Sequence, residues 1–402
     1  MEQWRRNLFI TAASVLVGQV CFSLPNAFFP LYLREVGQTT NLATWAGIVA
    51  GIQALVSGAM SPVWGALADR YGTRTMILRA GGGMALGSLA TALARTPMQL
   101  LVIRGMTGLV SGYVPAAMAL VACTAPESQM TYALGTVQTM SSIGVIIGPA
   151  LGGAFVQLIG MRGAFLFSAA VLFTISIIVV AGTRERTRPA TGKLDLVGDA
   201  TFVLRNRKLS VLCLTQGLSQ VGLLSTQVVL PLYVATFVRS NASLYAGILL
   251  SVSGISTALG AAALSSHKTG DNFTLYRTGL IASAILLAVQ GFVRSLTLLG
   301  AFRLLFGFAT AVASVAASVL VVNSVGASFR GRVLGFLHLM SSFGWALGQL
   351  MGGLVGDWLG MPASFVGGGI VYGVAAAITS MWLARSSDAA DRNPSVAATG
   401  RK

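Results

Sequence analysis

The sequence predicts an all-α membrane protein with twelve transmembrane helices in two pseudo-symmetric six-helix bundles, and three observations lead to this fold class. The 402-residue chain is 54% hydrophobic and only 9% charged, with a mean hydropathy of +0.77, whereas a soluble domain carries about a quarter charged residues. Its long apolar segments do not alternate polar and apolar residues, as the strands of a membrane barrel would. The segments also repeat after about two hundred residues, as parallel-repeat transporters do.

Twelve charge-poor segments follow one another along the chain, most of them close to the roughly 20 residues that a bilayer crossing needs. The first set lies at 8–33, 43–67, 75–94, 97–122, 132–158 and 163–182, and the second at 209–236, 244–264, 274–294, 296–323, 332–358 and 363–384. Lipid offers no partner for backbone amides and carbonyls, so an open chain crosses it as a helix. Each segment is therefore predicted to be one transmembrane helix.

Basic residues alternate between the connections of these helices. Five connections hold a single arginine each, namely Arg34, Arg95, Arg162, Arg239 and Arg294, whereas most other connections and both chain ends hold two or more. Positively charged loops stay in the cytoplasm, so we expect a multi-pass protein of the inner (cytoplasmic) membrane with both termini cytoplasmic. The net charge of +16 then reflects membrane topology, and no soluble face interleaves arginine with aromatic residues for nucleic acid.

The two halves of the chain match each other at a nearly constant spacing. The matches are Pro30-Leu31-Tyr32 with Pro231-Leu232-Tyr233, Ala46-Gly47-Ile48 with Ala246-Gly247-Ile248, Arg104 with Arg303, and Gly160-Met161 with Gly360-Met361. We expect one bundle in 1–183 and the other in 209–385, related as parallel repeats. Residues 184–208 are polar and basic and predict a cytoplasmic linker, and 386–402 predict a disordered cytoplasmic tail.

The turn between the second and third predicted helices has a distinctive order of glycine, acid and base. It reads Gly65-Ala66-Leu67-Ala68-Asp69-Arg70-Tyr71-Gly72-Thr73-Arg74. Glycine permits a tight turn between antiparallel helices, and the charges lie at the membrane surface. A generic basic loop would not explain this order. The candidate gate residues are Gly65, Asp69, Arg70, Gly72 and Arg74.

The fifth predicted helix combines spaced glycines with a proline. Its motif residues are Gly144, Gly148, Pro149, Gly152 and Gly153. Glycines four residues apart let helix backbones approach closely in lipid, and a proline inside a helix removes a hydrogen bond and bends the helix. Ordinary close packing is the alternative explanation, and the second-half copy has glutamine in place of the proline.

Two arginines, Arg104 and Arg303, lie inside predicted helices at equivalent positions of the two halves. Charge in the bilayer core costs at least about 2.5–3.5 kcal/mol and marks function by default. No Asp or Glu lies deep within a predicted span, so each arginine must use carbonyls, polar side chains, water or substrate. The alternative is an arginine near a helix end that extends its charge to the membrane surface.

These motifs resemble those of a known family. The 65–74 loop resembles the loop signature of the major facilitator superfamily, and the 144–153 pattern resembles the antiporter motif of its drug:proton antiporters. Arg104-Gly105, followed by Gly108 and Gly112, resembles the membrane arginine motif of that group. The resemblance covers residues 5–385 and is closest to the MdtG type of multidrug resistance transporter.

The resemblance implies roles for these motifs. Asp69 would dock near Gly331, Arg332 or Val333, at the start of the eleventh helix, when the cytoplasmic side is closed. The glycine-lined face of the fifth helix would pack at the seam between the halves and limit leakage. The second half has no matching loop at 265–270, so such a latch would be one-sided. Some drug exporters use an acidic residue deep in the membrane to carry protons and bind cationic drugs. This sequence has no acidic residue at such a depth.

Helical phase predicts a polar cavity between the first and seventh helices. The cavity residues are Gln19, Phe22 and Asn26 in the first helix and Gln216, Gln220 and Gln227 in the seventh. Uncharged amides at matched depths suit neutral or zwitterionic ligands, and hydrogen bonding between helices is the alternative. His338 could carry protons near neutral pH, although such a histidine is more often a packing residue.

We expect a secondary active exporter of drugs or other amphipathic small molecules, driven by proton antiport. An uptake permease for a metabolite is the alternative, because the fold alone does not set the direction of transport. No catalytic set, metal-ligand cluster or phosphate-binding loop is present in the sequence, so we expect no enzyme activity, metal or cofactor. The expected partners are a small-molecule substrate, protons and the lipid bilayer, with no nucleic acid, and the chain is expected to be monomeric.

Overall fold

The computed structural model describes residues 3–183, 201, 205–238, 240–265, 271–322, 324 and 330–392. Within these ranges all regular secondary structure is helical, which confirms the predicted all-α class. Most of the predicted linker (184–208) lies outside the described residues. The predicted tail begins inside a helix that continues to Arg392, so the boundary at residue 385 is seven residues too early in the structure.

The first half contains seven α-helices and two short 3-10 helices. They are α1 (Gln3–Ser23), η1 (Leu24–Ala27), α2 (Phe29–Glu35), α3 (Leu42–Tyr71), α4 (Thr73–Leu93), α5 (Pro97–Val110), α6 (Tyr113–Thr124), η2 (Glu127–Gln129) and α7 (Met130–Gly182). The second half contains α9 (Arg207–Ser225), α10 (Leu230–Phe237), α11 (Ala242–Ser265), α12 (Asn272–Gln290), α13 (Leu296–Val322), α14 (Arg330–Trp358) and α15 (Met361–Arg392).

Glycine and proline explain where these helices break. Pro25 lies in the first turn of the short η1 between α1 and α2, because proline cannot donate the hydrogen bond that would continue α1. Gly112 separates α5 from α6 with a φ of 113°, a conformation that glycine adopts without steric cost. Gly160 interrupts α7 at a φ of 73°, and its repeat partner Gly360 separates α14 from α15 at a φ of 90°. The sequence repeat is therefore also a repeat in backbone conformation.

Ten helical stretches among the described residues are long and apolar enough to cross a membrane. One of them, Glu127–Gly182, has 56 residues and contains the break at Gly160. Large apolar side chains are exposed on the outer surface of the protein, for example Leu86, Leu158 and Phe292. Such a surface is expected for a helical protein that faces lipid chains. The prediction of a polytopic helical membrane protein is confirmed at this level of detail.

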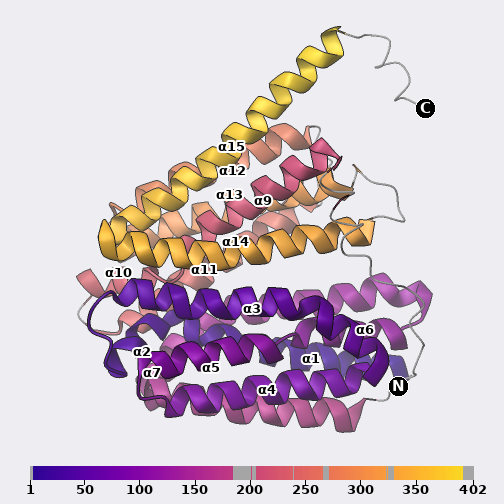
Figure 1. Ribbon diagram of the computed structural model, residues 1–402, viewed down its shortest axis with the longest axis vertical. Helices are drawn as coiled ribbons and strands as arrows, with labels where there is room; N and C mark the ends of the chain where they lie inside the picture. The colour runs from indigo at the N-terminus through magenta and orange to yellow at the C-terminus, as the bar shows by residue number, and fades with distance from the viewer. Residues whose placement is uncertain are drawn as a thin grey trace.

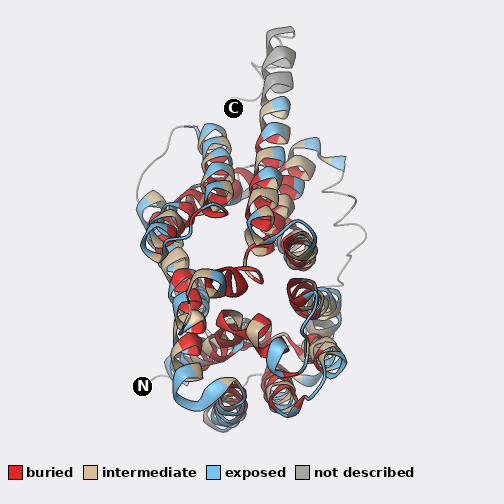
Figure 2. Ribbon diagram, turned by 90° about the vertical axis from the view of Figure 1, so that its left-hand side faces the viewer, coloured by how far each residue is buried: buried red, intermediate tan, exposed pale blue. Residues whose placement is uncertain are grey.

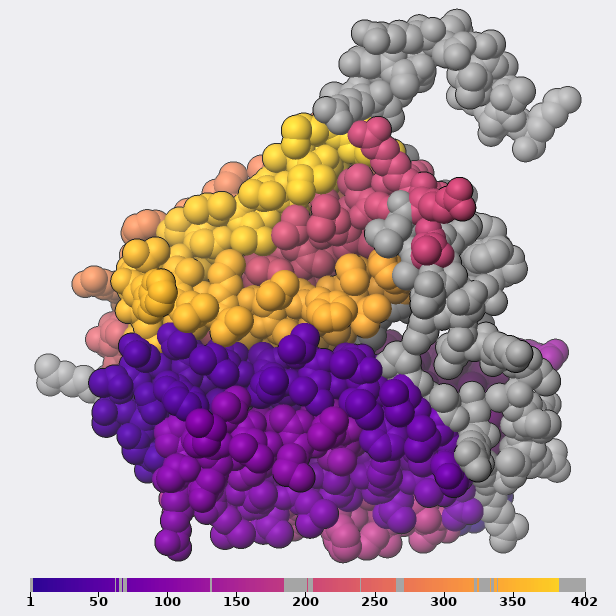
Figure 3. All heavy atoms as spheres, viewed as in Figure 1, coloured from indigo at the N-terminus to yellow at the C-terminus, as the bar shows by residue number. Residues whose placement is uncertain are grey.

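The two halves form separate layers of helices that meet along two helix pairs. In Figure 1 the first half lies below the second, and α3 runs alongside α14 where they meet. The other extensive pair between the halves is α7 with α11, and shorter contacts join α2 to α10 and η1 to α11. We call the end where α3 begins, on the left of Figure 1, the distal end, and the end that carries the N-terminus the terminal end. In Figure 3 the two halves touch along the α3–α14 line.

The buried hydrophobic residues join the halves at the distal end. One cluster contains distal residues of the first half, such as Leu24 and Ala46, together with Val229 and Leu230 of the second. A second cluster contains residues nearer the terminal end, such as Leu8, and belongs to the first half only. The end-on view in Figure 2 shows buried residues turned toward the interior of each ring of helices. Hydrophobic burial therefore holds the halves together mainly at the distal end.

Candidate functional site

The first contact between the halves, here called the first seam, lies between α3 and α14. Gly47 lies directly against the carbonyl of Gln349, and Gly353 against that of Ala43, with no room for a Cβ atom. Farther from the distal end the spacing relaxes, because a Cβ on Gly58 would lie 3.3 Å from Ser342 Cβ. Glycines allow this approach of two backbones, and the approach is tightest at the distal end.

The second seam lies between α7 and α11 and has the same arrangement. Gly247 lies directly against the carbonyl of Pro149, and a Cβ on Gly153 would lie 2.5 Å from the carbonyl oxygen of Ser243. Ser251 adds hydrogen bonds across this seam, to Ile146 and from Ala150. Two residues of the predicted antiporter motif, Pro149 and Gly153, therefore face the other half.

The other three glycines of that motif do not face the seam, which corrects the expectation that the whole glycine-lined face packs there. Gly144 and Gly148 pack against α1, and Gly152 packs against Leu24 of η1, all in the same half. The second-half copies pack in the same way against α9, for example Gly348 against the Val221 carbonyl, 2.5 Å from the position of a Cβ. Close packing inside each half therefore explains these three glycines.

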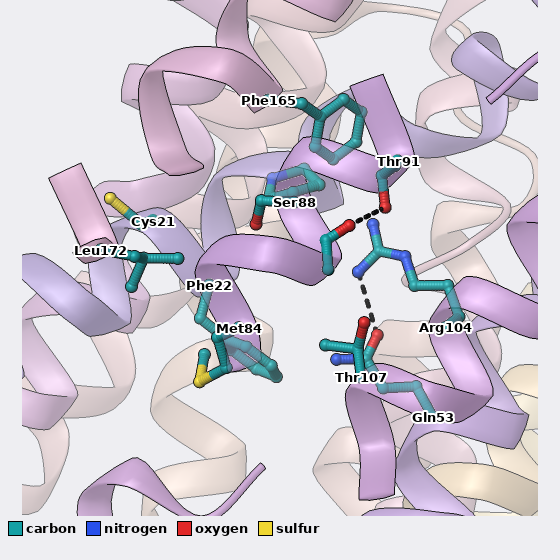
Figure 4. Close-up of a pocket in the computed structure, with 12 residues that line it drawn as sticks. Cys21, Phe22, Gln53, Met84, Ser88, Thr91, Arg104, Thr107, Phe165 and Leu172 are labelled. Carbon is teal, nitrogen blue, oxygen red and sulfur yellow. Dashed lines mark hydrogen bonds between the residues drawn. The ribbon is translucent and has the colours of Figure 1, made fainter. Parts of the chain in front are cut away.

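Arg104 of α5 lies against a small cavity inside the first half. The cavity has a volume of about 20 Å³, which is room for one water molecule. The Arg104 Nη1 donates a hydrogen bond to Gln53 Oε1 at 2.9 Å, and the guanidinium lies 4.5 Å from the ring centre of Phe29 and 5.8 Å from that of Phe165. Figure 4 shows Arg104 pointing between Gln53 and Thr91. The arginine is held by an amide and two aromatic rings, which stabilise a cation where water is scarce.

Arg303 occupies the equivalent place in the second half, with fewer partners. Its side chain is only 2% exposed and lies 5.9 Å from the ring centre of Phe365. Its Nε and Nη2 atoms have no hydrogen-bond partner among the described residues. The neighbouring rings repeat closely: Tyr32 and Phe165 are 5.1 Å apart, as are Tyr233 and Phe365. The two arginine sites are thus structural repeats that differ in their acceptors.

Of the predicted amides, Gln19 lies on α1 and Gln216 and Gln220 lie on α9, whereas Asn26 lies in η1 and Gln227 in the turn after α9. Gln19 and Gln220 occupy matched positions. Gln19 lies beside Gly144, and Gln220 beside Gly344; a Cβ on each glycine would meet the glutamine Cβ at 2.7 and 2.9 Å. Phe22 is 42% exposed and lines the Arg104 cavity. The remaining predicted members are Asn26 and Gln227, which are partly buried, and Gln216, which is buried.

Trp345 of α14 is a candidate that the sequence reasoning missed. Its Nε1 donates a hydrogen bond to Gln220 Oε1 at 3.0 Å, and the side chain is 37% exposed. On α14, Ala346 faces α3 and Gly344 faces α9, so Trp345 falls on the face between those two contacts. An aromatic ring and an amide therefore lie together beside the first seam. A lone tryptophan in an apolar helix gives no sequence signal for this position.

The structure places part of the gate loop. Gly72 connects α3 to α4 with a φ of 86°, which fits the predicted tight turn. Arg74 donates a hydrogen bond to the Val180 carbonyl at the end of α7, inside the same half. The surroundings of Gly65 and the side chains of Asp69, Arg70 and His338 lie outside the described part of the structure. The proposed contacts of Asp69 and the protonation role of His338 stay predictions.

Comparisons with known proteins agree with these features. The family model of the Major Facilitator Superfamily matches residues 11–289 and 274–401. The multidrug resistance protein MdtG of Citrobacter koseri is 34% identical over 371 residues, which cover 90% of this chain and 91% of that protein. MdtG of Escherichia coli is 33% identical over 372 residues, with the same coverage.

Solved structures share the fold. A bacterial homologue of the human lysosomal transporter Spinster, in an inward-facing and occupied conformation, has a TM-score of 0.78 at 16% identity; the match covers 95% of this chain and 97% of that one. The human organic anion transporter MFSD10 (TETRAN) has a TM-score of 0.65 at 19% identity, with 94% and 100% coverage.

Proposed function

Because this chain belongs to the Major Facilitator Superfamily, we propose that it is a secondary active transporter that exports drugs or other amphipathic small molecules by proton antiport with alternating access. The observation that carries this proposal is the similarity, over nine-tenths of both chains, to proteins that are named for multidrug resistance. Two pseudo-symmetric halves joined along two seams are suited to rocking around a site between them.

The finer architecture is part of the proposal. Gly160 divides the 56-residue stretch into two spans, and α14 adds one more, so the chain crosses the membrane twelve times. The distribution of basic residues then places both termini and the linker in the cytoplasm of the inner membrane. In this topology the distal end faces away from the cytoplasm, and the halves meet on the extracytoplasmic side.

The substrate site is proposed to lie between the halves, near Gln19, Gln220 and Trp345. The two amides lie at matched positions of the repeat, and the indole adds a flat apolar surface beside one of them. Amides and an aromatic ring accommodate planar neutral or zwitterionic compounds through hydrogen bonds and stacking. Arg104 adds a positive charge in the first half, at a cavity that Phe22 also lines.

Asp69 is proposed to stabilise the alternate state, in which the cytoplasmic side is closed. The register of the first seam supports this, because Gly47 lies opposite Gln349 and Gly58 opposite Ser342. Continued along both helices, this register brings residue 69 level with the first turn of α14. A carboxylate at a helix N-terminus contributes about 0.3–1 kcal/mol, and up to about 2 kcal/mol when partly buried, which is enough to bias two states a few kcal/mol apart.

The test is a toxicity panel in cells that lack their own exporters, comparing the wild-type chain with Asp69→Asn at equal membrane levels. Export predicts raised tolerance to some compounds with the wild type and reduced tolerance with the variant. Unchanged tolerance to every compound, despite normal insertion, would refute export. Proton antiport is tested separately in vesicles, where efflux that persists after the proton gradient is collapsed rules it out. If the compound is instead taken up in the direction of import in the same assay, an uptake permease is favoured.

A further inference from the structure

We propose that Asp357 and Ser251 are positioning residues of the transport cycle that hold the distal end closed. Each side chain belongs to the second half and forms hydrogen bonds with backbone groups of the first half. One acts in each seam. The identification of this end as extracytoplasmic rests on the proposed function. The hydrogen bonds of Asp357 and of Ser251 across the seams, here called the two clasps, rest on the contacts described below.

The clasp of the first seam is the Asp357 carboxylate at the end of α14. Its Oδ1 accepts a hydrogen bond from the Ala43 amide at 3.2 Å, and its Oδ2 accepts one from the Thr44 amide at 2.6 Å. These are first-turn amides of α3, which have no partner inside the helix. The carboxylate also lies at the positive end of the helix dipole. Asp357 thus caps a helix of the opposite half.

The local backbone explains why this cap comes from another part of the chain. Asn41 precedes α3 and is of a type that often caps helices. However, its φ is 49°, in the left-handed region, whereas a capping residue takes an extended conformation. The first turn of α3 therefore depends on an acceptor from outside, and the structure provides Asp357.

The clasp of the second seam is the Ser251 hydroxyl of α11. It donates a hydrogen bond to the Ile146 carbonyl at 2.5 Å and accepts one from the Ala150 amide at 3.2 Å. In a regular helix these two groups would bond to each other. Pro149 lies between them, and its ring clashes with the preceding turn and bends the helix. The serine of the other half thus adds a donor and an acceptor to backbone groups on either side of the proline in α7.

Neither clasp is present at the repeat-equivalent position. The position equivalent to Asp357 is Gln157, which is exposed, and no side chain caps the first-turn amides of α11 in the described part of the chain. The position equivalent to Ser251 is Gly51, which faces Ala346 of α14. In α14 the position equivalent to Pro149 is Gln349. Each seam therefore has a different polar contact, and both contacts require the distal ends to be together.

Opening the distal end would break both contacts and leave backbone groups without partners. A charged cap or a buried hydrogen bond of this kind biases a two-state equilibrium by roughly 5- to 30-fold. We therefore expect removal of either side chain to lower the ratio of distal-closed to distal-open molecules by a factor in that range. The variants would still fold, because both contacts join the halves and neither lies within one.

The experiment measures the distance between spin labels at positions 95 and 294, which are repeat-equivalent, exposed and at the distal end. The three native cysteines are replaced, and the protein is reconstituted in lipid nanodiscs. Asp357→Ala and Ser251→Ala are each expected to increase the long-distance population. Asp357→Glu and Ser251→Thr, which keep the carboxylate and the hydroxyl, are expected to restore the wild-type distribution.

Two matched controls separate clasping from general destabilisation. Gln157→Ala removes the repeat counterpart of Asp357, and Ser256→Ala removes a hydroxyl of α11 that bonds to the Leu304 carbonyl within the second half. Neither should change the distance distribution. If Asp357→Ala shifts the distribution no more than Gln157→Ala, the first clasp is refuted. The same comparison of Ser251→Ala with Ser256→Ala decides the second.

Hydrogen exchange gives a second measurement that does not depend on labelling. Asp357→Asn is expected to speed amide exchange at the start of α3, but not at the start of α11, where no side-chain cap is present among the described residues. Equal exchange in the variant and the wild type would refute the first clasp even if a label disturbed the distances. Neither measurement requires transport, so a chain that exports none of the tested compounds would still confirm or refute the clasps.

Discussion

Three glycines of α7 offer a direct test of which contacts control the equilibrium between conformations. A Cβ added to Gly153 would lie 2.5 Å from the Ser243 carbonyl oxygen, in the other half. A Cβ added to Gly144 would also lie 2.5 Å from a carbonyl oxygen, that of Leu16, but in the same half. Gly135 has no atom within 4 Å of the added Cβ. The same substitution on one helix thus meets a seam, an internal contact or open space.

The expected magnitudes follow from these distances. Ordinary contact begins at 3.4 Å, so either tight site must open by about 0.9 Å to accept alanine. Overpacking of this kind costs roughly 1–3 kcal/mol. For Gly153→Ala the cost falls on the distal-closed state alone, and the ratio of closed to open molecules should decrease about 5- to 150-fold. For Gly144→Ala the cost falls on every folded state and should lower the thermal stability instead.

The assay pairs the label distances between positions 95 and 294 with thermal unfolding in the same nanodiscs. We expect Gly153→Ala to change the distances with little loss of stability, and Gly144→Ala to do the reverse. Gly135→Ala should leave the distances unchanged and could raise stability, since alanine is favoured over glycine in helices by up to about 1 kcal/mol. If the variants at 144 and 153 change both quantities alike, the assignment of one glycine to the seam and the other to internal packing is wrong.

Three further predictions follow from individual side chains. Trp345→Ala and Gln220→Ala should each change the pattern of compounds tolerated in the toxicity panel at equal membrane levels, and an unchanged pattern for both would place the substrate elsewhere. Gln53→Leu removes the acceptor of Arg104 and should lower thermal stability by about 1–3 kcal/mol; Gln53→Glu, which keeps an acceptor, should not. Asp271 caps α12, and hydrogen bonds, first from the threonine hydroxyl of the first turn, lower the pKa of its carboxyl. The ionised cap therefore stabilises the folded state above the unfolded pKa near 4, and this stabilisation is lost as the pH falls below it. Thermal unfolding of the wild type and of Asp271→Ala should accordingly converge at low pH.

The sequence predicted those features that depend on one segment or on the repeat. Charge-poor segments of sufficient length indicated the helices, and the paired Gly160 and Gly360 recur as left-handed breaks. The equivalence of the two arginines was also predictable, because it follows from alignment of the halves. Each of these depends on local backbone preference or on hydrophobicity, both of which are visible in a linear sequence.

The packing partners of individual side chains could not be predicted in the same way. Arg104 and Gln53 come from different helices, and no spacing rule relates them. The sequence carries one signal of this kind: Gly153 follows Gly152 directly, so the two lie about 100° apart on a helix and cannot face the same neighbour. That phase difference separates the seam glycine from Gly152, which packs on η1 of its own half.

The two seams show how a duplicated protein can become asymmetric without losing its fold. The glycine contacts are the same in both seams, because any larger residue would prevent the backbones from meeting. The polar contacts differ in a correlated way: Pro149 lies opposite Ser251, whereas Gln349 lies in the seam that has Gly51. The proline bends α7 and weakens its hydrogen bonding locally, and the serine supplies a donor and an acceptor to the backbone groups on either side of it. The proline and the serine therefore constrain each other across the halves, and we expect Pro149→Ala to reduce the effect of Ser251→Ala on the distance distribution. Effects that simply add in the double variant would show that the two residues act independently.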